Sequence, residues 1–279
     1  MADVSRRAFN TAAVLIGVAL LAGSLVHAFL EGRWPASVPP EGPEYQLTQL
    51  IQALTAVDSR GMVDLKKLEA QREPLQRFMQ SMARHAPASE PERFATADER
   101  LAFALNAFHA MTLMQLLENP QAPRGFQSWP IGGQRLNRNA LRARFIDAVE
   151  DPRTALALFD GTLGSGVLDE NVFAAEFIER QLTDATQRFI RRPANVRLEG
   201  KVVHLSKVLT DQRQAFLERV PPDRRNLLQV VWAFLPTDCE GLAPGCLTRN
   251  DLDRACGQRF DQCSVVSETP SGDAAVSQP

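Results

Sequence analysis

Four polar side chains near the middle of the chain have types and spacings that could support acyl-transfer chemistry. Asn106 and His109 stand three residues apart in an apolar stretch, so both project from one face of a helix. Asp160 and Ser165 lie in the glycine-rich loop DGTLGSG, which reaches the helix if the loop packs there. These four residues are the candidate catalytic set of a hydrolase or transferase.

Other features of the same residues favour a binding or structural role. A serine nucleophile needs a general base within about 2.6 to 3.2 Å and an oxyanion hole. Gly164-Ser165-Gly166 also lacks the spacing of the G-x-S-x-G nucleophile turn. A histidine hydrogen-bonded inside a polar pocket accounts for His109 without catalysis. His85 is expected on the surface, and His204 at the solvent-facing side or edge of a sheet.

The cysteines form a second group of candidate residues, and their spacing predicts disulfides rather than a metal site. All of them lie in the last fifth of the chain, as Cys239-x6-Cys246-x9-Cys256-x6-Cys263. An even set in a short region of an exported domain indicates two disulfides. Structural zinc sites usually have ligands at closer spacing, and a redox pair would need C-x-x-C. The pairing stays open, and we expect no metal and no cofactor.

The N-terminal segment predicts that the domain is exported. Arg6 and Arg7 precede an almost unbroken apolar stretch over residues 11–30, which is long enough to cross a bilayer as a helix. We therefore expect a single-pass signal-anchor in the inner membrane, with the bilayer as partner and the domain on the periplasmic side. Cleavage after the small residues of Val26-His27-Ala28 remains the alternative.

The elements that must position these residues are mostly helices. The chain divides into a membrane or signal segment (1–33), a proline-rich linker (34–43), a folded domain (44–266) with a cysteine-rich cap (239–263), and a disordered tail (267–279). Periodicity predicts helices over residues 45–56, 65–83, 101–120, from about 139, 171–192, 223–235 and 248–260. A buried strand is expected over Leu156–Phe159 and a hairpin over 196–205. The fold class is α+β, helix-dominated, with short strands, in a single domain.

The balance of charges argues against a nucleic-acid partner. Lysine and arginine total 31 against 33 acidic residues, for a net charge of −2. Binding to a phosphate backbone would need a strongly basic face. An envelope protein or a small molecule is the expected partner of the domain.

The order of the motifs resembles the domain of unknown function 547 family. LAFALNAFHAMTL is followed by W-P-I-x-G, Asp151-Pro152-Arg153, a small-residue loop, QLxxATxxFI and a hairpin ending in VxLSKVL. The resemblance extends from about Leu101 to Val220, with a weaker similarity at Phe260–Ser264. It implies that Asp151 and Arg153 form a structural turn with an ion pair.

Several residues depart from the family pattern where that pattern is chemically reactive. The family's histidine position falls on Ala155, its two cysteine positions on Asp160 and Ser165, and the following proline on Gly166. One asparagine is retained as Asn106, whereas the second position carries His109. The resemblance therefore implies a degenerate, enzyme-like scaffold that binds or supports rather than catalyses.

Overall fold

The computed structural model describes residues 47–119, 126–222, 225–239, 245–269 and 276–277. The predicted membrane segment, residues 11–30, and the linker at 34–43 lie outside the described residues. Within the described ranges, no helix is both long and apolar enough to cross a membrane. Residues 44–279 group by their contacts into one compact unit.

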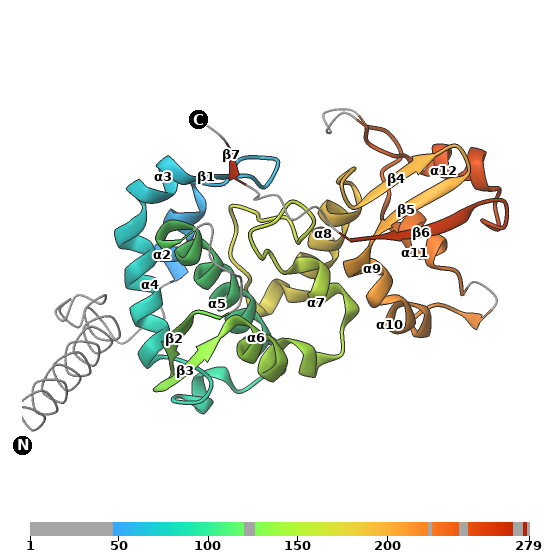
Figure 1. The fold of residues 1–279 in the computed structure, drawn as a ribbon. Coiled ribbons are helices and arrows are strands. Elements are labelled where there is room, and N and C mark those ends of the chain that lie inside the picture. Colours follow the sequence, from blue (N-terminus) through green and yellow to red (C-terminus); the bar gives the residue numbers. More distant parts are fainter. Residues whose placement is uncertain (1–46, 120–125, 223–224, 240–244, 270–275, 278–279) are drawn as a thin grey trace, which may run out of the picture. The chain divides into compact units, whose positions relative to one another are not determined.

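The N-terminal half of this unit is helical and confirms the helix-dominated α+β class (Figure 1). Its first helices are α2 (Leu47–Leu54), α3 (Leu65–Ala70), α4 (Arg72–Arg84) and α5 (Ala97–Glu118), with the short strand β1 (Val63–Asp64) before α3. The helix predicted over residues 65–83 is divided at Gln71, which ends α3 and begins α4.

Helix α5 is the central element of this half. Thr96 accepts a hydrogen bond from the Glu99 backbone, and the Glu99 side chain accepts one from the Thr96 backbone, which together form a capping box. Every residue from Leu101 to Leu116 is buried. Such a helix must be surrounded on all sides, and α5 contacts α3, α4 and the elements that follow it.

A hairpin and a series of short helical segments follow α5. Gly132 and Gly133 have φ values of 55° and 77°, which suits the tight turn between β2 (Ser128–Ile131) and β3 (Gln134–Asn137). The chain continues through α6 (Arg138–Leu141), a π-helical turn (Arg142–Ile146) and a 3-10 turn (Asp147–Val149).

The strand predicted over Leu156–Phe159 is wrong. Leu156 and Ala157 instead end α7 (Pro152–Ala157), and the chain then enters the glycine-rich loop. Asp151 caps the helix by accepting from the Arg153 backbone N–H, and Pro152 occupies a position that needs no N–H donor. These start signals outweigh the short apolar run that suggested a strand.

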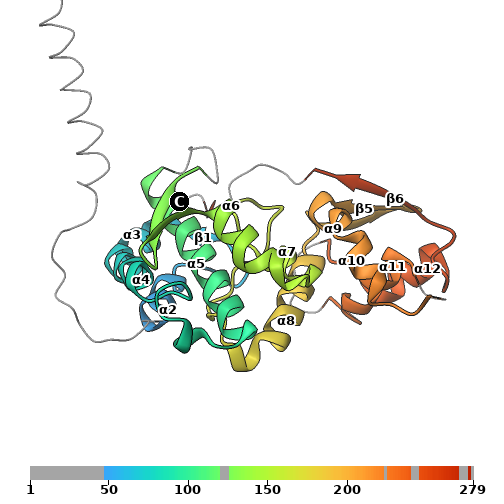
Figure 2. The same cartoon turned by 90° about the horizontal axis from the view of Figure 1, so that it is seen from below.

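The C-terminal half combines a small sheet with helices. Helix α8 (Ile178–Ile190), preceded by a 3-10 turn (Ala175–Phe177), leads to the predicted hairpin of β4 (Val196–Glu199) and β5 (Val202–Ser206). Strand β6 (Ser264–Glu268) pairs in parallel with the other side of β5. The helices between β5 and β6 are α9 (Lys207–Asp211), α10 (Arg213–Glu218), α11 (Leu227–Phe234) and α12 (Arg249–Cys256). Figure 2 shows α11 and α12 on one face of this sheet.

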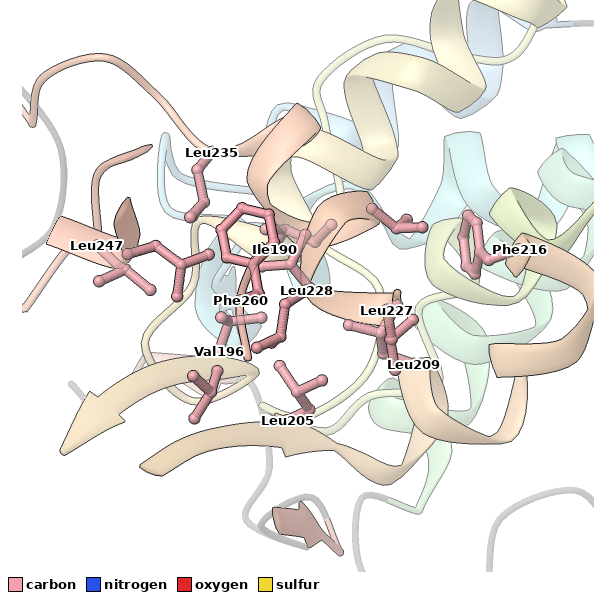
Figure 3. Packing of buried hydrophobic residues seen from close by; sticks show 14 of the residues in the cluster. Ile190, Val196, Leu205, Leu209, Phe216, Leu227, Leu228, Leu235, Leu247 and Phe260 are labelled. Atoms are coloured by element: carbon pink, nitrogen blue, oxygen red, sulfur yellow. The ribbon is translucent and has the colours of Figure 1, made fainter. Parts of the chain in front are cut away.

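The core of this half lies between the sheet and those helices (Figure 3). Val196 and Leu205 point from the strands toward Leu228 and Phe260, and all of them are nearly fully buried. Because β5 is the central strand, His204 is not at a sheet edge as expected. Its ring nitrogens instead contact Glu268 at 2.7 Å and Glu199 at 3.3 Å.

The C-terminal tail differs in part from the disorder expected over residues 267–279. Ser267 and Glu268 complete β6, and β7 (Val276–Ser277) pairs in parallel with β1. Residues 270–275 and 278–279 lie outside the described residues.

Candidate functional site

His109 lies in the middle of α5 and is only 6% exposed. Its Nε2 is 3.1 Å from the carbonyl oxygen of Ala157 and 3.3 Å from the backbone nitrogen of Phe159. Burial lowers the pKa of His109 to about 4; the hydrogen bond to Ala157 opposes this shift, and the charge of Arg188 adds to it. The imidazole is therefore neutral near pH 7.

Asn106 lies one helical turn earlier and binds a different backbone segment. Its Nδ2 donates to the Phe173 carbonyl and its Oδ1 accepts from the Phe173 N–H, both at 2.8 Å. Gln181 of α8 binds the peptides on either side: it accepts from the Ala174 N–H at 2.8 Å and donates to the Val172 carbonyl at 2.7 Å. Two amide side chains from different helices thus hold residues 172–174.

Thr112 continues the polar face of α5, and sequence reasoning missed it. Its hydroxyl contacts the Phe159 carbonyl at 3.1 Å, and it accepts from Nη1 of Arg138 at 2.7 Å. Asn106, His109 and Thr112 follow one another at every third position, and the other residues from Leu101 to Met114 are apolar, so the signal was present in the sequence. We call these three residues the α5 polar stripe.

Arg138 is the second residue that sequence reasoning missed. It is 2% exposed, donates to the carbonyl of Asp160 at 3.1 Å, and lies with its guanidinium carbon 5.4 Å from the centre of the Phe108 ring. Nothing in the local sequence distinguishes it from surface arginines.

The side chains of the glycine-rich loop bind within the loop itself. Asp160 Oδ1 accepts from the backbone and the hydroxyl of Thr162, at 2.8 and 2.7 Å. Ser165 Oγ donates to the Thr162 carbonyl at 2.8 Å and accepts from the Asp160 N–H at 3.2 Å. Within the described ranges, Ser165 therefore has no imidazole or carboxylate as a base.

Gly166 brings the end of this loop against the end of α7. Its N–H donates to the Leu158 carbonyl at 2.8 Å. A Cβ at Gly166 would lie 2.7 Å from backbone atoms of Ala157 and Leu158, so a larger residue would displace the loop. The glycine at this position is required by the close approach of two backbone segments.

A cavity of about 360 Å³ adjoins His109. Its wall includes Val167, Phe173 and Arg188, but Asn106, Asp160 and Ser165 are absent from it. His109 is therefore the one candidate residue of the four that lines this cavity, and the four do not converge on it. Ala155 faces a separate cavity of about 590 Å³, together with Asp151 and Arg219.

Asp151 and Arg153 form the predicted ion pair. Arg153 Nη2 lies 2.6 Å from the Asp151 carboxylate and 2.8 Å from that of Glu179, and Nη1 donates to Thr183 at 3.1 Å. Burial alone would raise the pKa of Asp151, but the Arg153 hydrogen bonds and the charges of Arg153 and Arg219 hold it below its ordinary value. This cluster joins α7 to α8.

The cysteines form two disulfides between sequence neighbours, Cys239–Cys246 and Cys256–Cys263. Cys256 is fully buried in the C-terminal core. His85, expected on the surface, is instead half-buried beside Glu90 at 2.7 Å. In the part of the chain that the structure describes, no group of three or more histidine, cysteine or acidic residues could hold a metal ion.

Comparison with known proteins identifies the region that contains the α5 polar stripe, the loop and α8. Residues 92–190 match the model of the family described as "Protein of unknown function, DUF547". The match confirms the predicted resemblance to the DUF547 family over this segment. The match ends at the end of α8, so the hairpin and the Phe260–Ser264 similarity lie outside the DUF547 segment. No curated protein and no solved structure matches the chain.

Proposed function

We propose that this chain is a membrane-anchored envelope protein whose DUF547 region binds or supports rather than catalyses. One observation carries the proposal: the candidate catalytic side chains bind backbone atoms of their own fold. Asn106 holds Phe173, His109 contacts Ala157 and Phe159, and Ser165 binds within its loop. These hydrogen bonds hold backbone segments of the fold in place, so a structural role accounts for the three polar side chains without catalysis.

The local chemistry supports the same proposal. A serine hydroxyl becomes a useful nucleophile when a base withdraws its proton. Ser165 donates its proton to a carbonyl oxygen, which is not a base, and Asp160 accepts from Thr162. His109 binds at Nε2 to a different backbone segment.

Membrane anchoring through residues 11–30, with the domain on the periplasmic side, remains part of the proposal. Its support is the apolar segment after Arg6 and Arg7, together with the two disulfides. Disulfides persist in the periplasm and are rare in the cytosol. The proposed partners are the lipid bilayer for the segment and an envelope protein or small molecule for the domain.

A turnover screen tests the non-catalytic role. The purified full-length chain is incubated with ester, amide and thioester substrates, alongside the Ser165→Ala and His109→Ala variants. We expect no turnover above that of the variants. Turnover that either substitution abolishes, in a variant that retains a cooperative thermal melt, would refute the proposal.

An alternative function rests on the cavity beside His109. A neutral imidazole at the wall of a cavity could act as a general base toward a bound molecule. A hydrolase or transferase would then use Asn106, His109, Asp160 and Ser165, and a loop rearrangement would have to free Ser165. The same screen separates the two functions.

A further inference from the structure

Strand β6 covers one edge of β5 but presents an open edge of its own. The strand order β4-β5-β6 places it at the end of the sheet, as Figure 1 shows. Its first four residues are all exposed, and two of them are apolar: Val265 is 38% and Val266 is 42% exposed. Exposed apolar side chains on an unpaired strand are typical of a site that pairs with another strand.

The opposite edge of the sheet has a protection that β6 lacks. Arg197 and Glu199 of β4 place a charge at every second position of that strand. Charged side chains of this kind keep an edge strand from pairing with other chains. β6 contains no lysine, arginine or proline, and the carboxylate of its single charged residue, Glu268, accepts from Nη2 of Arg197 at 2.7 Å. The edge of β6 is therefore open to a second strand.

The hydrogen bonds to β5 determine which backbone groups of β6 point outward. The Ser264 N–H donates to the Lys201 carbonyl at 3.0 Å, so Ser264, and with it Val266, directs its N–H and C=O toward β5. Val265 and Ser267 alternate with them and direct theirs to the open side. These four outward groups have no hydrogen-bond partner among the described residues. They are the donors and acceptors that an added strand would use.

Both ends of β6 are held in place within the chain. Cys263, the residue before the strand, is disulfide-bonded to Cys256. At the other end, Glu268 pairs with Arg197 and lies 2.7 Å from Nδ1 of His204. A strand that is already fixed loses little conformational freedom when it pairs. The open edge is therefore preorganised.

We propose that β6 pairs with β6 of a second copy of this chain, in an antiparallel dimer centred on Val266. In this register Val265 lies opposite Ser267 of the second copy, and Ser267 lies opposite its Val265. Each of these pairs exchanges two N–H···O=C bonds, so all four outward groups of each strand are satisfied. The two Val266 side chains meet at the centre as a non-hydrogen-bonded pair, the arrangement in which opposite side chains are closest.

The strand favours this partner because its sequence is self-complementary. Antiparallel pairing about Val266 places Glu268 opposite Ser264 of the second copy, so the two glutamates lie about 14 Å apart. A parallel pairing in register would place these like charges side by side. A two-fold axis at Val266 uses one surface twice, as in most homodimers. The strand lies outside residues 92–190, so this inference goes beyond the proposed function and is independent of it.

Disulfide cross-linking of the full-length chain in intact cells tests the dimer and its register. After oxidation with copper phenanthroline, Val266→Cys should give a cross-linked dimer on a non-reducing gel. Val265→Cys should cross-link at least about fivefold less, because each Val265 lies diagonally about 7 to 8 Å from its counterpart, beyond ordinary disulfide reach. Val149→Cys controls for random collisions, since Val149 is 37% exposed and lies in the 3-10 turn before α7.

Two edge variants impair pairing and leave the bonds to β5 in place. Val266→Lys sets like charges opposite each other at the centre of the dimer. Val265→Pro removes an outward N–H, at a position where an edge strand tolerates proline. Sedimentation of the full-length chain in detergent micelles should show a dimeric parent, and each edge variant should raise the dissociation constant at least about tenfold. Val149→Lys is the matched control and should leave the dissociation constant unchanged.

Every outcome supports or overturns this inference. A Val266→Cys cross-link together with loss of the dimer in Val266→Lys would support it. A monomeric parent, absence of that cross-link, equal cross-linking of Val265→Cys, or a dimer that Val266→Lys retains would overturn it. A cross-link from Val266→Cys to a different protein in place of a second copy would also overturn it. Thermal melts establish that each variant is folded, and Val266→Lys alone suffices if Val265→Pro does not fold.

Discussion

Asn106 and Phe173 exchange a reciprocal pair of hydrogen bonds, with the asparagine amide binding both the N–H and the carbonyl of one residue 67 positions away. The pair joins α5 to the segment that leads into α8. It explains, in structural terms, why an asparagine can be needed at this position in the absence of catalysis.

Asn106→Ala should lower the free energy of unfolding by about 2 to 4 kcal/mol, because it leaves two buried backbone groups without partners. Urea denaturation measures this loss, and hydrogen exchange at the Phe173 amide should become faster. Asn171→Ala provides the control, because Asn171 is exposed and should change stability by less than about 0.5 kcal/mol. Equal stability of Asn106→Ala and the parent would contradict the structural role.

The buried His109 should make the domain less stable in mild acid. The unfolded histidine takes up a proton near its ordinary pKa of 6.5, whereas the folded one does so only near pH 4. The contribution of His109 to the free energy of unfolding is therefore complete above about pH 6.5. It decreases by about 3 kcal/mol in total as the pH falls toward 4. Stability measured by urea denaturation from pH 7.5 to 4.5 should show this slope.

His109→Asn supplies the control for that slope, because asparagine does not titrate. The variant should have a flatter dependence of stability on pH between 6.5 and 4.5. An unchanged slope would mean that other groups cause the acid sensitivity.

Arg153→Ala should destabilise the fold by about 2 to 3 kcal/mol, because it leaves the 7%-exposed Asp151 without its closest cation. Arg254→Ala is the matched control: its side chain is 80% exposed and lies 3.9 Å from Asp251, so its loss should be below about 0.5 kcal/mol. Similar effects in the two variants would argue against a buried ion pair between α7 and α8.

The two disulfides should differ in their contribution to stability. Paired replacement of Cys256 and Cys263 by alanine should reduce stability by about 2 to 3 kcal/mol, since it releases a short loop and disturbs a buried core position. Replacement of Cys239 and Cys246 by serine should have the smaller effect. Mass spectrometry of the unreduced protein should find no free thiol, and four alkylatable cysteines or bound zinc would contradict the pairing.

Reporter fusions after Pro43 test the topology that Arg6, Arg7 and residues 11–30 predict. A reporter that folds only outside the cytoplasm should be active, and a cytoplasmic reporter should not. The opposite pattern would end the export proposal. The N-terminal sequence of the native protein then distinguishes an anchor from a cleaved signal peptide.

Local patterns in the sequence were sufficient for much of the fold. The Thr96–Glu99 capping box, the turn at Gly132-Gly133 and the alternation around Glu199-Gly200 depend on residues close in sequence, and each is present in the structure. The Leu156–Phe159 error arose because an apolar run suits a strand or a buried helix equally, and the Asp-Pro start decided between them.

The partners of the candidate site were less predictable. Asn106 and His109 share a face as expected, but both bind backbone groups, which every residue carries and no sequence pattern marks. Gln181 and Arg138 contribute from other elements, and their positions depend on tertiary packing. The disulfide pairing was also open, because equal spacings in the two halves of the cysteine cluster suit more than one connection.

The parallel pairing of β6 with β5 has a consequence for the order of synthesis. When Val202–Ser206 emerges from the ribosome, the strand that covers its free side, Ser264–Glu268, has not yet been made. At about 5 to 20 residues per second, a ribosome needs several seconds to add the intervening residues. Throughout that interval the β5 edge exposes unpaired backbone groups that can pair with another chain. The C-terminal half of the domain therefore acquires its protected edge only near the end of translation. A nonsense mutation before Ser264 would remove β6 and leave the β5 edge unpaired in every copy.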